Sequence, residues 1–222
     1  MINGDVFIFG APAVHLPGWQ SGSAHRIMPE NGSAAPHPHV NLIDAALGPL
    51  EGKRERLQLW AHSGATRVLS ASTTATVAAQ ESWVSARMHI VGIDPLLMAA
   101  GGQTVTVAGA NAGDLEWLQS LWPDRTFVGV ADAIGQVFSR EILPIVNEAA
   151  DFVARGVPQD DIDRGTKLGL NYPKGPLEWA ELFGWDAVYW GLAALADMYG
   201  PRFRPHPWIR AQVGSSLLKP NN

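Results

Sequence analysis

Short apolar runs alternate with helical segments through the first 130 residues, and this alternation restricts the fold more than any other feature of the chain. Each run is short and apolar and is bounded by turn residues, as expected of a buried strand. Six such runs predict strands, at Asp5–Gly10, Val40–Ala45, Arg67–Ala71, Met88–Ile93, Thr104–Ala108 and Phe127–Val130. Pro49–Ala61 and Asp114–Leu121 have helical spacing. Strands that take turns with helices favour an α/β layer with a mostly parallel sheet.

The first of these expected helices, Pro49–Ala61, has an apolar face and a charged face. The spacing puts three residues on the inner face, Leu50, Leu57 and Trp60, and three on the solvent face, Lys53, Arg54 and Arg56. We therefore expect the lysine and both arginines of this helix to lie in water.

From Ala11 to His39 the composition changes to Pro, Gly, Ser and His, with almost no apolar periodicity. We expect a partly disordered loop of nearly thirty residues, which is unusually long for a compact domain. His37 and His39 stand in the sequence PHPH within it. Two histidines without a third ligand are more often polar loop residues than a metal site, so we predict that the chain binds no metal.

After Ser139 the pattern becomes helical. Apolar residues recur every three or four positions over Ile142–Val153, in a stripe that ends at Gly156. A second helix is expected over Pro176–Gly184, with the proline in its first turn and the glycine at its end. A third is expected over Asp186–Gly200, capped by the aspartate.

The composition excludes several classes of partner. The chain has 222 residues, of which 46% are hydrophobic, so it is long enough to bury a core. A net charge of -5 gives no basic surface for nucleic acid. The absence of cysteine fits a reducing compartment, and no window is apolar enough to span a membrane. We therefore expect a soluble, cytoplasmic protein without nucleic-acid or membrane partners.

Five motifs follow one another almost without gaps between Thr66 and Val213: STTATV, GIDP, SREILPIVNEA, PKGPLEW and RFRPHPWIR. In this order they resemble the 3-hydroxyacyl-CoA dehydrogenase family. The resemblance implies a nicotinamide-binding, doubly wound domain followed by a helical domain that forms dimers. It also implies hydride transfer between NAD and the hydroxyl carbon of a 3-hydroxyacyl-CoA.

The N-terminal segment, where the family binds its cofactor, differs from the family pattern. The family's first strand runs into a G-x-G-x-x-G turn that cradles the pyrophosphate, but here FGAPAVHLPG follows. Only Gly10 matches, because Pro12 and Val14 stand where bare glycine is needed. The loop Ala11–His39 replaces the family's first helix, second and third strands and the helix between them. The acidic residue that holds the adenosine ribose and the segment that contacts CoA belong to the same missing part, so we expect no NAD site.

The residues at the family's catalytic positions also differ from the family pattern. The family uses a histidine base paired with a glutamate, and a serine and an asparagine hold the substrate oxygen. Aligned without gaps from STTATV, these positions carry other residues: Thr73 for the serine, Asp94 for the histidine, Thr106 for the glutamate and Ser139 for the asparagine. A carboxylate of ordinary pKa is a poor base at neutral pH, so no residue is assigned a catalytic role. A register shift of five residues would instead put His89 at the base position, but it loses the GIDP match.

We therefore expect a trimmed Rossmann-like α/β domain with a truncated parallel sheet in residues 1–138 and a helical dimerisation domain in residues 139–222. The protein is expected to be a homodimer without dehydrogenase activity. Two alternatives stay open. One is an active NAD-dependent 3-hydroxyacyl-CoA dehydrogenase with an atypical site, in which Asp94 is the base. The other is a protein that still holds a small acyl ligand in the cleft between its domains.

Overall fold

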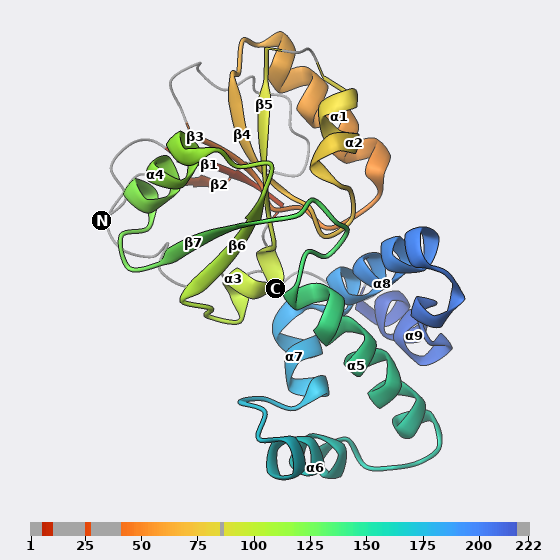
Figure 1. Ribbon diagram of the computed structural model, residues 1–222. Coiled ribbons are helices and arrows are strands. Elements are labelled where there is room, and N and C mark those ends of the chain that lie inside the picture. The colour runs from red at the N-terminus through yellow and green to blue at the C-terminus, as the bar shows by residue number, and fades with distance from the viewer. Residues whose placement is uncertain (1–5, 11–24, 28–40, 85–86, 217–222) are drawn as a thin grey trace.

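A seven-stranded sheet forms the centre of the molecule in the computed structural model, which describes residues 6–10, 25–27, 41–84 and 87–216 (Figure 1). The strand order is β2-β1-β3-β4-β5-β6-β7. The strands are β1 (Val6–Phe9), β2 (His25–Ile27), β3 (Asn41–Asp44), β4 (Arg67–Ala71), β5 (His89–Ile93), β6 (Thr104–Ala108) and β7 (Thr126–Val130). The expected class, an α/β layer followed by helices, is confirmed.

The helices fall into two groups. The first group alternates with the strands and comprises α1 (Leu50–His62), α2 (Val77–Ser82), α3 (Pro95–Ala99) and α4 (Ala112–Leu121). The second group comprises α5 (Phe138–Ala154), α6 (Gln159–Leu170), α7 (Pro176–Phe183), α8 (Trp185–Tyr199), the 3-10 turn η1 (Pro201–Phe203) and α9 (Pro207–Ser216). In Figure 1 the second group gathers beside one end of the sheet, with α6 farthest from it. Helices α2, α3, α6 and α9 are additional to those that the apolar pattern predicts. The expected cap of α8 at Asp186 is wrong, because the helix begins at Trp185 with Gly184 as its N-cap and Asp186 inside its first turn.

One pair of strands in the sheet is antiparallel. β6 runs opposite to β5, whereas the other neighbouring strands are parallel. The connection from β5 to β6, residues 94–103, contains only the short helix α3 and a tight turn. A parallel crossover needs a dozen or more residues, so this connection returns the chain antiparallel. The longer connection through α4 allows β7 to lie parallel to β6.

A short strand lies inside the segment expected as a loop. β2 pairs in parallel with β1, with Val6 opposite His25 and Ile8 opposite Ile27. The expectation of an uninterrupted loop over 11–39 is therefore wrong at residues 25–27, because backbone pairing to an existing strand needs no apolar periodicity. The rest of that segment, with His37 and His39, lies outside the described residues.

Helix α1 buries a different face from the one predicted. Leu57 and Trp60 are buried as expected, but Leu50 is 45% exposed and Lys53 only 1%. Lys53 lies four residues before Leu57 and seven before Trp60, on the same helical face. The carboxylate of Asp44, at the end of β3, accounts for its position, since Nζ lies 3.4 Å from Oδ1. An ion pair with a neighbouring strand therefore decides which face of α1 turns inward.

Alternate residues of the central strands enter two cores. On one face Leu42, Val68 and Ile90 pack with Leu57 and Trp60 of α1. The other face belongs to a larger cluster that extends from β1 to α9 and includes Val6, Ile43, Leu69, Val91, Leu118, Val146, Leu195 and Ile209. One core thus joins the sheet to the helical part. The division of the chain at residues 138 and 139 stays a prediction.

The segment PKGPLEW forms the start of α7, and a side chain of α6 holds it. Asp163 accepts hydrogen bonds from the backbone N–H groups of Leu177 (2.9 Å) and Glu178 (3.2 Å). These N–H groups belong to the first turn of a helix, which leaves them without partners in the helix itself. A Cβ at Gly175 would collide with the Asp163 carboxylate, so only glycine fits there. The motif is therefore a helix N-terminus capped from the neighbouring helix.

Candidate functional site

Asp94, which the resemblance puts at the base position, caps the starts of two helices. It is the N-cap of α3, where Oδ1 accepts a hydrogen bond from the backbone of Leu96 at 3.1 Å. The start of α5 is bound to the same carboxylate: the backbone N–H of Ser139 donates to Oδ2 at 2.9 Å and its hydroxyl to Oδ1 at 2.7 Å. The hydroxyl of Thr73 adds a longer bond of 3.4 Å. Asp94 therefore ties the end of β5 to the beginning of the helical part.

Thr73, Asp94 and Ser139 form a closed cluster, called the Asp94 cluster below. Each of the three residues is 0% exposed. The structure thus brings together three of the four positions that the resemblance assigns, but it does so in the protein interior. In this arrangement the cluster presents no atom to a substrate.

The fourth position, Thr106, has its hydroxyl bonded to a residue outside the Asp94 cluster. Its hydroxyl donates to the side-chain oxygen of Gln136 at 2.7 Å. The amide of Gln136 donates in turn to the hydroxyl of Ser72, also at 2.7 Å. Gln136 takes a left-handed backbone conformation with φ +44° just before α5. Thr106 therefore helps to hold the turn into α5.

Burial raises the pKa of the Asp94 carboxyl above its ordinary value, because the charged form loses its hydration. The hydrogen bonds from Ser139 and Leu96 oppose that shift by stabilising the carboxylate. A raised pKa is common among catalytic acids and bases, but it also occurs in structural networks. Here the carboxylate oxygens are occupied by backbone and hydroxyl donors, and the arrangement suits a structural anchor.

His89 lies at the opposite end of β5 from Asp94. The two residues are five positions apart on an extended strand, which corresponds to about 16 Å. The ring of His89 contacts two acids, Asp114 at 2.9 Å and Glu81 at 3.5 Å. Because its strand end is far from Ser139, His89 cannot take the base position beside the other assigned residues. The position of His89 therefore gives the register-shifted alternative no support.

A dinucleotide in a doubly wound fold binds where the strand order reverses, at the carboxyl ends of the strands. In this sheet the reversal lies at β1, which has β2 on one side and β3 on the other. Described residues of the chain pack closely against one another there. A Cβ at Gly10 would collide with Ala46 of the β3–α1 connection, and the guanidinium of Arg56 lies 3.9 Å from the centre of the Phe9 ring.

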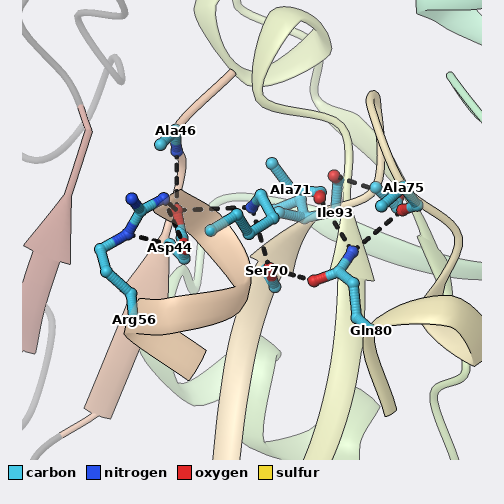
Figure 2. Close-up of polar contacts among 10 residues, drawn as sticks. Asp44, Ala46, Arg56, Ser70, Ala71, Ala75, Gln80 and Ile93 are labelled. Carbon is cyan, nitrogen blue, oxygen red and sulfur yellow. Dashed lines mark hydrogen bonds and ion pairs between the residues drawn. The ribbon is translucent and has the colours of Figure 1, made fainter. Parts of the chain in front are cut away.

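The polar groups at this reversal are bonded to one another (Figure 2). Asp44, fully buried, accepts hydrogen bonds from Arg56 at 3.0 to 3.2 Å and from the backbone of Ala46 at 3.0 Å. Lys53 pairs with Asp44 and donates to Ser70 at 3.2 Å. Burial lowers the pKa of Lys53, while the nearby Asp44 opposes the shift. The described residues therefore do not fit NAD, since Lys53 and Arg56 are both already held by the buried Asp44 carboxylate.

The same network continues into the β4–α2 connection. Ser70 donates to the side-chain oxygen of Gln80 at 2.5 Å, and the Gln80 amide donates to the carbonyls of Ala71 and Ala75 (Figure 2). Gln80 is buried, and both ends of its amide are used. The loop that carries Thr73 is thus held from both sides, by Gln80 and by Asp94.

An opening of about 280 Å³ lies between this loop and α8. Thr74 and Trp83 line it on the sheet side, and Trp190, Ala194 and Asp197 line it on α8. No member of the Asp94 cluster is among its described lining residues. Space for a small molecule therefore exists between the two parts of the chain, beside the Asp94 cluster and separate from it.

The helical part has known relatives. The sequence profile of the 3-hydroxyacyl-CoA dehydrogenase, C-terminal domain, matches residues 135–219. The chain is homologous to the 3-hydroxyacyl-CoA dehydrogenases. It is 35% identical over 121 residues to 3-hydroxyadipyl-CoA dehydrogenase of Escherichia coli (strain K12), covering 50% of this chain and 25% of that protein. It is 34% identical over 93 residues to 3-hydroxybutyryl-CoA dehydrogenase of Clostridioides difficile, covering 41% of this chain and 33% of that protein.

The fold of this 3-hydroxyacyl-CoA dehydrogenase homologue is also found among solved structures. FadB2 of M. tuberculosis superposes with a TM-score of 0.67 and 17% identity, over 86% of this chain and 70% of that one. At this identity the likeness concerns the fold alone. The matches to the two curated relatives cover a quarter to a third of their length, so the activity, substrates and partners of the whole protein are proposals.

The described residues also bear on a metal site and on a membrane-spanning helix. No three His, Cys, Asp or Glu side chains gather there as a metal site requires. The predicted lack of a metal stays a prediction, because His37 and His39 lie outside those ranges. None of the described helices combines the length and apolar character needed to cross a membrane.

Lys53, Asp163 and Gln136 are among the residues of the polar networks that the sequence did not indicate. Lys53 was placed in water because the helical pattern treats any lysine as solvent-facing. Asp163 and Gln136 gave no local signal, since each acts on an element far along the chain or across the sheet. The one usable sign was the pair of apolar neighbours of Lys53, four and seven residues on, which share its face.

Proposed function

We propose that this chain is a 3-hydroxyacyl-CoA dehydrogenase homologue that does not dehydrogenate 3-hydroxyacyl-CoA. The observation that carries the proposal is the closed Asp94 cluster, in which the carboxylate at the base position is fully buried and bonded to Ser139 and Leu96. A general base must come within hydrogen-bonding reach of the proton it removes. Asp94 reaches a substrate only if the bonds that hold the start of α5 are broken.

The second feature that supports the proposal is the lack of a binding site for the hydride acceptor, NAD. The sequence FGAPAVH lacks the glycines and the N–H donor of a pyrophosphate cradle. Beside it, the cations Lys53 and Arg56 are already paired with Asp44. Both features support a chain that does not use NAD.

The test is an assay of the purified chain with 3-hydroxybutyryl-CoA and either NAD or NADP. We expect no reduced cofactor above a heat-killed control. Loss of the base alone would cost about 10² to 10⁴ in rate, which a sensitive assay still detects, but loss of the acceptor site removes the reaction. The double variant Asp94→His/Thr106→Glu should therefore stay inactive as well. NADH formation that rises in proportion to the unmodified protein would overturn the proposal.

The alternative is an active dehydrogenase with Asp94 as its base. The raised pKa of that carboxyl is the observation in its favour, because a base works best with a pKa near the working pH. This alternative requires turnover by the unmodified chain and its loss in Asp94→Asn. Turnover that survives this substitution would exclude Asp94 as the base.

Further proposals concern assembly, ligand and location. We propose a homodimer formed through the helical part, where Phe152, Leu168 and Leu170 are half or more exposed. An acyl ligand between the two parts is a third candidate, for which the opening beside Thr74 offers space. We propose a cytoplasmic location because the chain has no cysteine and fits a reducing compartment.

A further inference from the structure

One stripe of side chains on α8 faces the opening between the two parts of the chain. The side chains at the centre of that stripe are small. Trp190, Ala193, Ala194, Asp197 and Met198 line the opening, at the spacing of a single helical face. The two alanines stand in the middle of the stripe, with larger residues at either end. Alanines also line the opposite wall, on the β4–α2 connection and α2. The opening therefore exists because small residues line both of its walls.

The walls and the rim of this opening are largely apolar. Trp83 and Trp190 are half-buried in it, while Leu50 and Met198 are 45% and 56% exposed at its edge. Its volume, about 280 Å³, lies at the lower end of the range of small-molecule sites, which begins at roughly 300 Å³. An apolar group of modest size gains by leaving water for such a hollow.

The charge of the opening is negative. Among the described residues that line it, Asp197 is the only charged one, and it forms no ion pair within the described part of the chain. Indole faces attract cations through their quadrupole, and a carboxylate adds direct attraction. With two tryptophans and one acid, the described lining favours a cation and opposes an anion.

We propose that this opening binds a small organic amine, with its alkyl or aryl group between the alanine walls and its ammonium group near Asp197 and Trp190. The proposal does not depend on the absence of dehydrogenase activity. It assigns the opening a ligand class opposite in charge to an acyl-CoA, and its test contains neither CoA nor a nicotinamide cofactor. The two proposals can therefore fail separately.

The experiment compares three probes with the same chain length: hexylammonium, hexan-1-ol and hexanoate. Titration calorimetry of the full chain near neutral pH keeps the first cationic and the last anionic. We expect hexylammonium to bind about fivefold more tightly than hexan-1-ol, from a cation–π contact and the attraction of Asp197 together. Hexanoate, which stands for a free acyl group, should be the weakest of the three.

Two variants and a control test whether the probes bind in this opening and whether Asp197 contributes to the preference for hexylammonium. Ala194→Leu fills the hollow and should abolish binding of hexylammonium and hexan-1-ol alike. Asp197→Asn should reduce the preference for hexylammonium over hexan-1-ol to about twofold, since partly exposed charge pairs contribute modestly. Asp161→Asn, an exposed acid at the start of α6, should change neither.

Three results would overturn the proposal. The first is hexanoate binding as tightly as hexylammonium, which would favour an acyl-type ligand. The second is no detectable heat from any probe at millimolar concentration. The third is hexylammonium binding that Ala194→Leu leaves unchanged, because the amine would then occupy another place.

Discussion

At the scale of single residues, Lys53 is a cation that lies in the protein interior. It is buried, and its positive charge shares one carboxylate, Asp44, with Arg56. Removing Lys53 leaves Asp44 paired with Arg56, so no charge in this group loses its partner. Replacing buried ionic groups by apolar ones of similar volume is often neutral or stabilises by about 1 to 4 kcal/mol. We expect Lys53→Met to be at least as stable as the unmodified chain near neutral pH, measured by denaturant unfolding.

The pH dependence of this difference has a definite sign. Burial lowers the pKa of Lys53 below 10.5 in the folded chain, so between the lowered pKa and 10.5 the unfolded chain binds more protons. The unfolding free energy of the unmodified protein, relative to Lys53→Met, should therefore rise as pH increases through that window. Arg54→Met, an exposed cation one residue on, is the control and should change stability by less than about 0.5 kcal/mol. A loss of several kcal/mol in Lys53→Met would contradict this account.

At the scale of elements, the start of α7 depends on the contact between Asp163 and Gly175. Loss of a helix cap costs about 0.5 to 2 kcal/mol, so Asp163→Ala should lower the unfolding free energy by this amount. Gly175→Ala should also destabilise, because its Cβ collides with the Asp163 carboxylate. In the double variant the collision is gone. The losses of unfolding free energy in the two single variants should then add up to more than the loss measured in the double variant. A double-mutant cycle detects such a difference between residues in contact.

Asp161→Ala serves as the matched control for this cycle. It removes an exposed acid from the same helix, two residues before Asp163, and should combine additively with Gly175→Ala. Additivity of Asp163→Ala with Gly175→Ala would instead show that the two residues do not constrain each other.

At the scale of the whole molecule, the helical part leaves large apolar side chains in water. Leu168 and Leu170 on α6 are 77% and 62% exposed, and Phe152 on α5 is 50% exposed. A second copy of the chain would cover such a surface. We expect sedimentation at micromolar concentration to give about twice 23.9 kDa. The double variant Leu168→Glu/Leu170→Glu should sediment as a folded monomer.

Leu59→Glu is the control for the dimer, since Leu59 is 40% exposed on α1, outside the helical part. It should leave the mass unchanged. A monomeric unmodified chain would contradict the prediction, and so would a dimer that Leu59→Glu dissociates while the α6 variant remains intact.

Much of the element order follows from local sequence. The strands at Arg67–Ala71 and Thr104–Ala108 lie where the apolar runs predict them, and glycines follow α7 and α8 as expected. These features depend on propensities and turn residues within a few positions of each other. The resemblance likewise identified three positions that meet in space: Thr73, Asp94 and Ser139.

The sequence by itself therefore determined the class of fold and the approximate positions of six strands: β1, β3, β4, β5, β6 and β7. The tertiary structure alone decided that the Asp94 cluster is closed, that Thr106 is bonded to Gln136, and that Lys53 turns inward. Each of these outcomes depends on partners distant in the chain: Ser139 is 45 residues from Asp94, and Gln136 is 30 from Thr106. Periodicity measures only how one element divides its own residues between core and water. Whether a polar group is satisfied inside depends on donors and acceptors that other elements bring to it.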